Sequence, residues 1–134
     1  MDFDVDYQKR AVTMALRAWQ LRINKLRFRR ERNPDVNVDF NVSFQPHDKF
    51  NSEHVLAHAW YPGQGDISGD CEINDEDWDW VSNVHESTMG KPPLVQVLIH
   101  EFGHSLGLRH DTIDRTSIMY PSVDLGKPTY KQRS

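Results

Sequence analysis

Residues 100–110 read His100-Glu101-Phe102-Gly103-His104-Ser105-Leu106-Gly107-Leu108-Arg109-His110, which spaces three histidines, one glutamate and one glycine as H-E-x-x-H-x-x-G-x-x-H. On a helix, side chains four positions apart project from the same face, so His100 and His104 can bind one ion together. Gly107 can adopt the left-handed conformation that ends a helix and reverses the chain. His110 can then return to the ion as a third ligand. This stretch therefore predicts a helix that carries a metal site.

The ligand set indicates catalytic zinc. Three protein ligands leave a fourth coordination position open, whereas structural zinc sites are closed by a fourth ligand. A water in the open position is acidified to a pKa of about 7. Glu101 follows the first ligand but is displaced round the helix, so we interpret it as a general base and not as a ligand. It would take a proton from the water and return it to the leaving amine, which predicts peptide hydrolysis.

Further blocks resemble a known family. Ser117-Ile118-Met119-Tyr120-Pro121 is similar to the Met-turn of the metzincins, in which a methionine (here Met119) forms an apolar floor under the histidines. Leu56-Ala57-His58-Ala59-Trp60-Tyr61-Pro62-Gly63, Gly69-Asp70, the zinc motif and the Met-turn together resemble the catalytic domain of matrixins, the matrix metalloproteinases. The resemblance covers about residues 4–121. It implies an α+β, zincin-like fold: a twisted mixed β-sheet packed against an N-terminal helix and the zinc helix, in a single domain over residues 1–134.

The resemblance also implies an activity and its substrates. It implies a secreted, zinc-dependent endopeptidase that cleaves extended proteins such as those of the extracellular matrix. The strand at residues 55–60 would be the sheet edge that a substrate joins antiparallel, contacting Leu56 and Ala57. The main side-chain pocket would lie between the zinc helix and the segment that begins with Tyr120 and Pro121. Gln96 would shape the floor of that pocket, although an exposed helix position is the alternative for this residue.

A second, structural zinc site is expected from the family, but the sequence departs from its pattern. Matrixins hold this ion with three histidines and an aspartate, and His58 matches one of these ligands. His47 and Asp48 could supply two more, although a plain surface loop is an equal alternative for them. Glu72 stands where the last histidine is expected. A site of this composition would be richer in oxygen and weaker than the family site.

Calcium binding is a further expectation from the resemblance. Asp39, the turn with Gly63 and Gly65, and Asp70 match positions where matrixins gather oxygen ligands around one calcium ion, and such ligands suit a hard cation. A run of acids at Asp75, Glu76, Asp77 and Asp79 is a second candidate. For that run, the exposed start of a helix is the preferred alternative.

Apolar periodicity predicts the other elements. Residues 4–21 carry apolar side chains at helical spacing, including Val5, Val12, Leu16 and Trp19. Residues 26–31 and 36–44 alternate apolar and polar side chains and predict two strands, and residues 55–60 predict a third. Residues 94–106 predict the zinc helix, entered after two prolines. The family's first strand and last helix have no counterpart in residues 1–3 and 122–134.

Composition narrows the function classes. With 134 residues, 37% hydrophobic and 27% charged, the chain is ordinary for a globular domain. Its net charge of −4 argues against a nucleic-acid or anionic-membrane partner, and no stretch is apolar enough to span a bilayer or resembles a signal peptide. A basic run at Lys25, Arg27, Arg29, Arg30 and Arg32 is interpreted as a solvated strand face in preference to a polyanion patch. The single cysteine, Cys71, has no partner for an internal disulfide.

A non-catalytic protein is the competing hypothesis. A truncated metzincin domain could bind zinc or a peptide without turnover. Such a protein has no need of Glu101, so the presence of this glutamate favours the enzyme. A closed structural zinc site is disfavoured because no cysteine pair is available to complete it.

Overall fold

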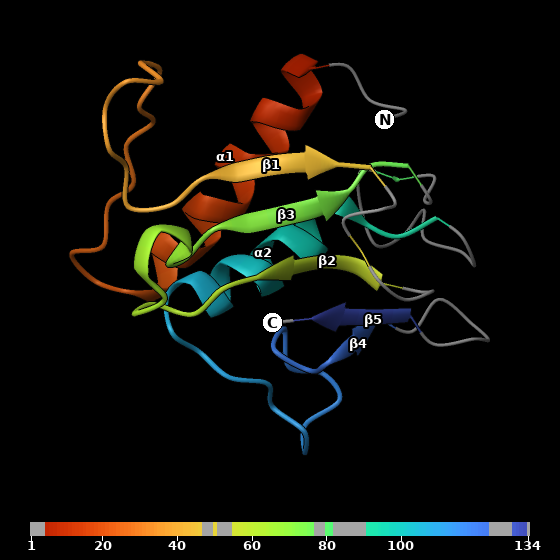
Figure 1. Cartoon of the computed structure of the whole chain (residues 1–134). Helices are drawn as coiled ribbons and strands as arrows, with labels where there is room; N and C mark the ends of the chain where they lie inside the picture. Colours follow the sequence, from red (N-terminus) through yellow and green to blue (C-terminus); the bar gives the residue numbers. More distant parts are fainter. Residues whose placement is uncertain are drawn as a thin grey trace.

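The computed structural model describes residues 5–46, 50, 55–76, 80–81, 91–123 and 130–133. These residues form a five-stranded mixed sheet with two α-helices, α1 and α2, lying behind it in the view of Figure 1. The predicted α+β class is confirmed. None of the helices that the described residues form is long and apolar enough to cross a membrane.

Helix α1 spans Val5–Arg22 and matches the N-terminal helix that the sequence predicts. Its buried face carries Ala11, Ala15 and Trp19, which are four residues apart and so lie on one side of the helix. The two small alanines let the helix approach its neighbours closely. Trp19 Nε1 donates a hydrogen bond to the Ile99 carbonyl at 2.8 Å, which ties α1 to α2. Val5, expected on the inward face, is 60% exposed because it stands at the very start of the helix.

Helix α2 spans Leu94–Ser105 and is the predicted zinc helix. It is buried on several sides, because it is packed against both α1 and the sheet. The helix ends at Leu106, where the chain takes a tight turn through Gly107 with φ of +100°. The Gly107 N–H donates to the His104 carbonyl and the Leu108 N–H to the Gly103 carbonyl, both at 2.9 Å. The predicted left-handed glycine is therefore confirmed.

The sheet has the order β1-β3-β2-β5-β4. Strands β1 and β3 are parallel, β3 and β2 antiparallel, β2 and β5 parallel, and β5 and β4 antiparallel. Their bounds are Val42–Gln45 for β1, Val55–Ala59 for β2, Cys71–Asn74 for β3, Ser122–Val123 for β4 and Tyr130–Arg133 for β5. A short 3₁₀ helix, η2 at Gly65–Ile67, lies in the loop before β3.

Residues 26–31 do not form the strand that their alternation predicts. They run past α1, and the Phe28 N–H donates to Gln20 Oε1 at 2.8 Å, so this donor is not available to a neighbouring strand. The alternation itself is real, because Leu26 and Phe28 pack against the core while the intervening Arg27 is exposed. The strand predicted for residues 36–44 is likewise reduced to β1.

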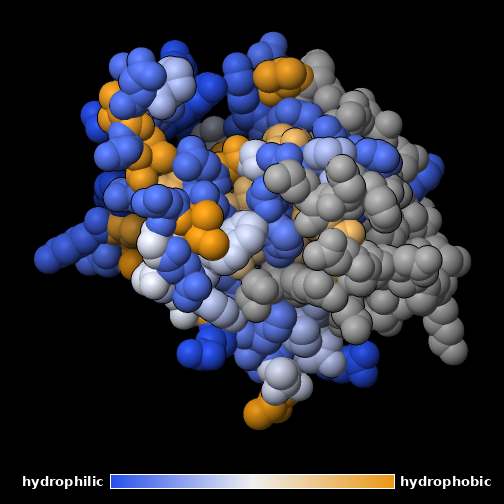
Figure 2. Space-filling view, in the orientation of Figure 1, coloured by the Kyte–Doolittle hydropathy of each residue, from blue (hydrophilic) through white to orange (hydrophobic). Residues whose placement is uncertain are grey.

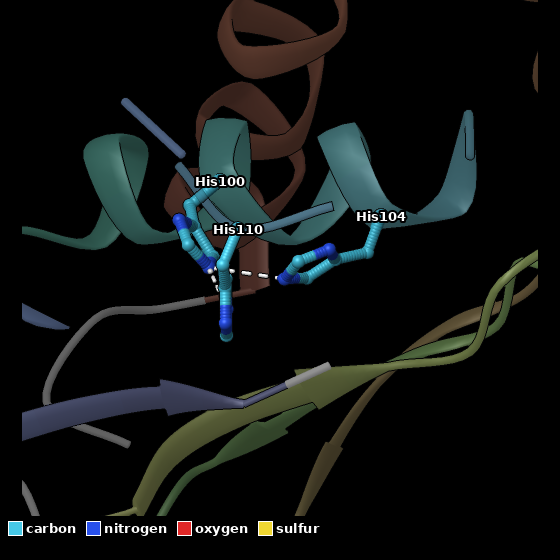
Figure 3. Close-up of side chains that lie close together, drawn as sticks. All are labelled: His100, His104 and His110. Atoms are coloured by element: carbon cyan, nitrogen blue, oxygen red, sulfur yellow. Dashed lines mark hydrogen bonds between the residues drawn. The ribbon is translucent and has the colours of Figure 1, made fainter. Parts of the chain in front are cut away.

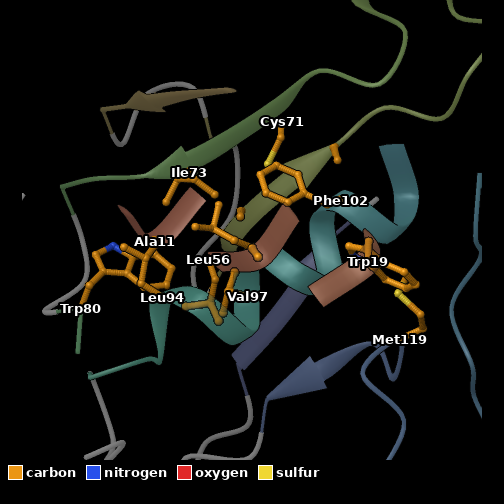
Figure 4. Close-up of a cluster of buried hydrophobic side chains, with 14 residues drawn as sticks. Ala11, Trp19, Leu56, Cys71, Ile73, Trp80, Leu94, Val97, Phe102 and Met119 are labelled. Carbon is orange, nitrogen blue, oxygen red and sulfur yellow. The ribbon is translucent and has the colours of Figure 1, made fainter. Parts of the chain in front are cut away.

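One apolar core joins both helices to the sheet (Figure 4). Leu56 of β2, Ile73 of β3 and Phe102 of α2 are fully buried in it. Helix α2 also approaches the Met-turn closely, because a Cβ placed on Gly103 would lie 2.4 Å from Met119 Sδ. A glycine at this position therefore lets the segment that follows the third histidine pack directly on the helix.

Candidate metal centre

Three histidines from two parts of the chain converge at one point (Figure 3). His100 and His104 lie one turn apart on α2 and are buried, while His110 returns from the loop after Gly107 and is half-buried. His100 Nε2 lies 3.1 Å from His104 Nε2 and 3.3 Å from His110 Nε2. The local sequence accounts for this arrangement, since the helical spacing aligns the first two rings and the glycine turn brings back the third.

The separations between these nitrogens match a tetrahedral zinc site. Zinc binds imidazole nitrogen at about 2.0–2.1 Å, so two nitrogens at corners of one tetrahedron lie roughly 3.3–3.4 Å apart. The observed separations of 3.1 and 3.3 Å are close to this value. Among the described residues, these histidines are the one group of three or more histidine, cysteine or carboxylate side chains that could hold a metal ion.

Backbone carbonyls set the tautomers of the two helical histidines. His100 Nδ1 lies 2.7 Å from the Ile118 carbonyl oxygen, and His104 Nδ1 lies 2.8 Å from that of Leu108. A carbonyl can only accept a hydrogen bond, so each Nδ1 carries the proton and donates it. In the neutral ring the lone pair is then on Nε2, which is the atom that faces the common point.

Burial keeps both helical imidazoles neutral. It lowers the pKa of His100 to about 3, with a smaller lowering from the neighbouring His104 and His110. It lowers the pKa of His104 to about 4 for the same two reasons, burial being the larger. A metal ligand must be unprotonated, so these rings are ready to bind an ion at neutral pH without first losing a proton.

Glu101 is fully buried beside the first histidine. Among the described residues, neither of its carboxylate oxygens has a hydrogen-bond partner. Burial raises its pKa well above the ordinary value, because the charged form is poorly solvated there. A buried carboxylate without a partner is costly unless it meets a proton, a water or a cation, so this orphaned group fits a metal ion and its water next to it.

The sequence did not reveal every contact that shapes the centre. The carbonyls of Leu108 and Ile118 orient two ligands, but any residue type offers a carbonyl, so no sequence signal marks them. The Tyr61 ring packs edge-on against the His104 ring, with centroids 5.3 Å apart. The Arg109 guanidinium lies over the same Tyr61 ring, 5.6 Å from its centroid. An aromatic residue just after a strand that precedes a metal helix is the signal that could have suggested Tyr61.

The Met-turn residues lie where they support α2. Met119 is 6% exposed, and its backbone carbonyl accepts the Asp111 N–H at 2.9 Å, which closes the loop that carries His110. Tyr120 and Pro121 follow and are half-buried, and Arg115 lies over the Tyr120 ring at 5.6 Å. Gln96 is half-buried on α2, one turn before His100.

Of the four ligands expected for a second zinc, the structure brings two together. His58 of β2 and Glu72 of β3 are cross-strand partners, and His58 Nε2 lies 2.7 Å from Glu72 Oε1. His47 and Asp48 lie outside the described residues. Within the described part of the chain, no third histidine, cysteine or carboxylate joins this pair to complete a site of three such ligands. The second zinc stays a prediction.

The residues expected around calcium are partly engaged elsewhere. Asp70 Oδ1 accepts the Asn41 N–H at 2.8 Å and so links the loop to β1. Gly63 and Gly65 both have positive φ, of +88° and +70°, as a tight turn requires. In the described part of the chain, neither Asp39 nor Asp70 belongs to a group of three metal-binding side chains. Calcium therefore also stays a prediction. In the other acidic run, Asp77 and Asp79 are outside the described residues.

The expected substrate edge is covered in this structure. Strand β2 does not lie at the edge of the sheet, because β5 pairs with it and separates it from β4. Leu56 and Ala57 are both 0% exposed, so their side chains are buried in the core. A neighbouring strand could therefore contact only the backbone groups of these two residues. In Figure 3 the strand β5 passes the side of α2 from which the histidines project. No local pattern predicts this pairing, since the residues after Pro121 have no clear periodicity.

Comparisons with known proteins agree with the geometry. A family model described as Matrixin matches residues 1–133. Interstitial collagenase of Bos taurus is 49% identical over 67 residues, which cover 50% of this chain and 13% of the relative. Macrophage metalloelastase of Rattus norvegicus is 36% identical over 123 residues, covering 89% of this chain and 24% of the relative. Hatching enzyme of Paracentrotus lividus is 36% identical over 137 residues, covering 97% and 21%.

This chain therefore spans less than a quarter of the length of these relatives. The match of the family model, in contrast, extends over almost all of the chain and includes the three histidines and the Met-turn. On this ground the protein belongs to the matrixin family.

Proposed function

We propose that this chain is the catalytic domain of a zinc-dependent endopeptidase, with zinc held by His100, His104 and His110. The observation that carries the proposal is the convergence of three histidine Nε2 atoms near a buried carboxylate that has no hydrogen-bond partner among the described residues. A structural site would be closed by a fourth protein ligand, and Glu101 would then have no task. Membership of the matrixin family supports the same chemistry.

In the proposed reaction, Glu101 moves the proton. A bound zinc ion would supply a Lewis acid for the peptide carbonyl and an acidified water. Glu101 is the carboxylate next to the first ligand, and its burial raises its affinity for a proton. It would accept the proton of the attacking water and deliver it to the leaving amine. The backbone carbonyls of Leu108 and Ile118 would hold the two helical ligands in their orientation throughout.

We further propose that an extended substrate occupies the place between β2 and β4. Strand addition gives affinity through the backbone, and pockets for alternate side chains give specificity. Leu56 and Ala57 would contribute backbone groups, while Gln96, Tyr120 and Pro121 would line the pocket beside α2. In this structure β5 takes that place, pairing with β2 on one side and β4 on the other. A substrate strand must therefore displace β5.

The substrates to test first are proteins of the extracellular matrix. The names of two relatives, an interstitial collagenase and a macrophage metalloelastase, refer to collagen and elastin. We propose the same class of protein substrate for this chain. The same family supports a secreted protein. The second zinc at His58 and Glu72 and the calcium at Asp70 remain separate proposals, to be tested by metal analysis of the purified chain.

The proposal is tested by following hydrolysis of a quenched collagen-like peptide. The zinc-loaded chain is expected to cleave the peptide, to stop when a chelator removes the zinc, and to resume when zinc is added in excess. Chelation should also lower the melting temperature, since an ion bound only by the folded state stabilises it. Hydrolysis that continues in the presence of chelator would contradict a metal-dependent reaction.

A non-catalytic domain is the second candidate, and the position of β5 favours it. A strand that fills the place of the substrate would permit zinc binding while excluding peptides. The same assay separates the two functions. Stoichiometric zinc without any cleavage, for this chain and for a variant with weakened β5 pairing, would support the non-catalytic function.

A proline in β5 is expected to increase activity. Gln132→Pro removes an N–H from a strand that is paired on both sides, and proline is poorly tolerated in such a strand. A backbone hydrogen bond contributes about 0.5–1.5 kcal/mol, so kcat/KM should rise by up to about tenfold. Gln132→Ala, which keeps the N–H, is the matched control and should behave as the wild type. Equal rates for both variants would show that β5 does not compete with the substrate.

A further inference from the structure

A surface segment that follows α1 carries concentrated positive charge. Residues 22–32 contain six basic side chains and one acidic side chain, although the whole chain has a net charge of −4. All six basic side chains are exposed. We call this set the basic strip: Arg22, Lys25, Arg27, Arg29, Arg30 and Arg32.

The fold holds the basic strip in a defined shape. Leu26 and Phe28 pack against the core, and the Phe28 ring meets the Phe40 ring edge-on with centroids 6.2 Å apart. The hydrogen bond from the Phe28 N–H to Gln20 ties the segment to α1. These inward anchors leave Arg27 and the following Arg29 exposed. Arg22 ends α1, Lys25 lies in the turn after it with φ of +70°, and the remaining four arginines follow over residues 27–32, so the charges are spread along the segment. Where the backbone is extended, side chains two residues apart are separated by roughly 6.6–6.8 Å.

No acidic side chain of the described residues neutralises the basic strip. Glu31 is the one acid within it, and Glu31 Oε1 accepts the Asn33 N–H at 2.9 Å. Arg27 donates a hydrogen bond to the backbone carbonyl of its neighbour Leu26. None of the six basic side chains forms an ion pair with a described carboxylate. Like charges held this close repel one another and lower the stability of the fold. If this surface contacted only water, a mixture of positive and negative side chains would avoid the repulsion. An anionic partner that neutralises the positive charges accounts for the arrangement.

We propose that the basic strip binds a linear sulfated polysaccharide. A linear polyanion matches charges that are spread along a segment, and its binding releases condensed counterions. A single-stranded nucleic acid would also need exposed aromatic rings for base stacking, but the one aromatic residue within the strip, Phe28, is turned inward. A flat anionic membrane would also meet the acidic remainder of the chain. The polysaccharide is therefore the preferred partner.

The basic strip and the three histidines belong to different segments of the chain. In Figure 1 the segment after α1 runs out along the left side, whereas α2, which carries His100 and His104, lies behind the sheet. In the same view, Figure 2 shows hydrophilic side chains protruding at the left margin among hydrophobic ones. None of the three histidines belongs to the strip, so the proposed binding can be tested separately from the proposed hydrolysis.

The test measures binding of heparin, as a linear sulfated polysaccharide, at several salt concentrations. If the slope of about 0.9 per neutralised charge known for duplex DNA holds, six contacts imply an affinity that falls about 10³-fold between 50 and 200 mM salt. The triple variant Arg27→Gln, Arg29→Gln and Arg30→Gln should fall only about 40-fold over that range, since three contacts remain. The triple variant Lys9→Gln, Arg10→Gln and Arg17→Gln removes equal charge from α1 and is the matched control.

The expected result is tight binding with a steep salt dependence, a reduced slope for the strip variant and an unchanged slope for the control. Circular dichroism should show that both variants fold, because all six positions are exposed. An equal loss in both variants would overturn the strip as the site and indicate attraction by general charge alone. Weaker binding of heparin than of a single-stranded oligonucleotide or of anionic phospholipid vesicles would overturn the polysaccharide.

Discussion

The Glu101→Gln variant is expected to bind zinc as tightly as the wild type and to hydrolyse the peptide about 10²- to 10⁴-fold more slowly, the usual contribution of a positioned acid–base group. Glutamine has nearly the same shape, so it fits the fully buried position. Its amide cannot accept the proton of the attacking water or carry it to the leaving amine. The two measurements are kcat/KM on the quenched peptide and the zinc content of the dialysed protein.

A change of the same chemistry at a remote position is the control. Glu31→Gln alters a carboxylate that contacts only the backbone of Asn33 among the described residues, so it should leave kcat/KM unchanged. Two results would contradict the role assigned to Glu101. Loss of zinc in Glu101→Gln would make the residue a ligand, and full activity would require a different base.

The His110→Ala variant is expected to lose more than about 100-fold in zinc affinity, because removal of a supporting contact alone typically costs 10- to 100-fold. His110 is the ligand that comes from outside the helix, and its Nε2 lies 3.3 Å from that of His100. Without it, two helical histidines remain, and they cannot enclose the ion. Zinc affinity measured by competition with a chromogenic chelator gives the size of the effect.

Arg109→Ala is the matched control for this variant, since it changes the adjacent loop residue and contacts Tyr61 but none of the proposed ligand atoms. Zinc should also raise the melting temperature of the wild type and of Arg109→Ala, but not that of His110→Ala. A zinc affinity that is unchanged in His110→Ala would remove this residue from the ligand set.

Local rules sufficed for the elements that carry the site. The spacing of His100 and His104 needs only the helical repeat, and Gly107 needs only the conformational freedom of glycine, so both could be predicted without a fold. The helix at Val5–Arg22 and the strand at Val55–Ala59 follow equally from local periodicity. The prediction of a strand at residues 26–31 was wrong, because alternation of apolar and polar residues indicates only which side chains point inward. It does not reveal whether a neighbouring strand exists.

The family, the α+β class, the three histidines and the glutamate beside them could thus be predicted from the amino-acid sequence alone, because their chemistry is encoded in residue type and spacing along one helix and its turn. The groups that surround them become visible only in the folded chain. The carbonyls that orient His100 and His104, the burial that raises the pKa of Glu101, the pairing of His58 with Glu72 and the cover of β2 by β5 all depend on contacts between segments distant along the chain. Backbone groups carry no residue signature, and burial is a property of the packed molecule, so neither can be read from local spacing.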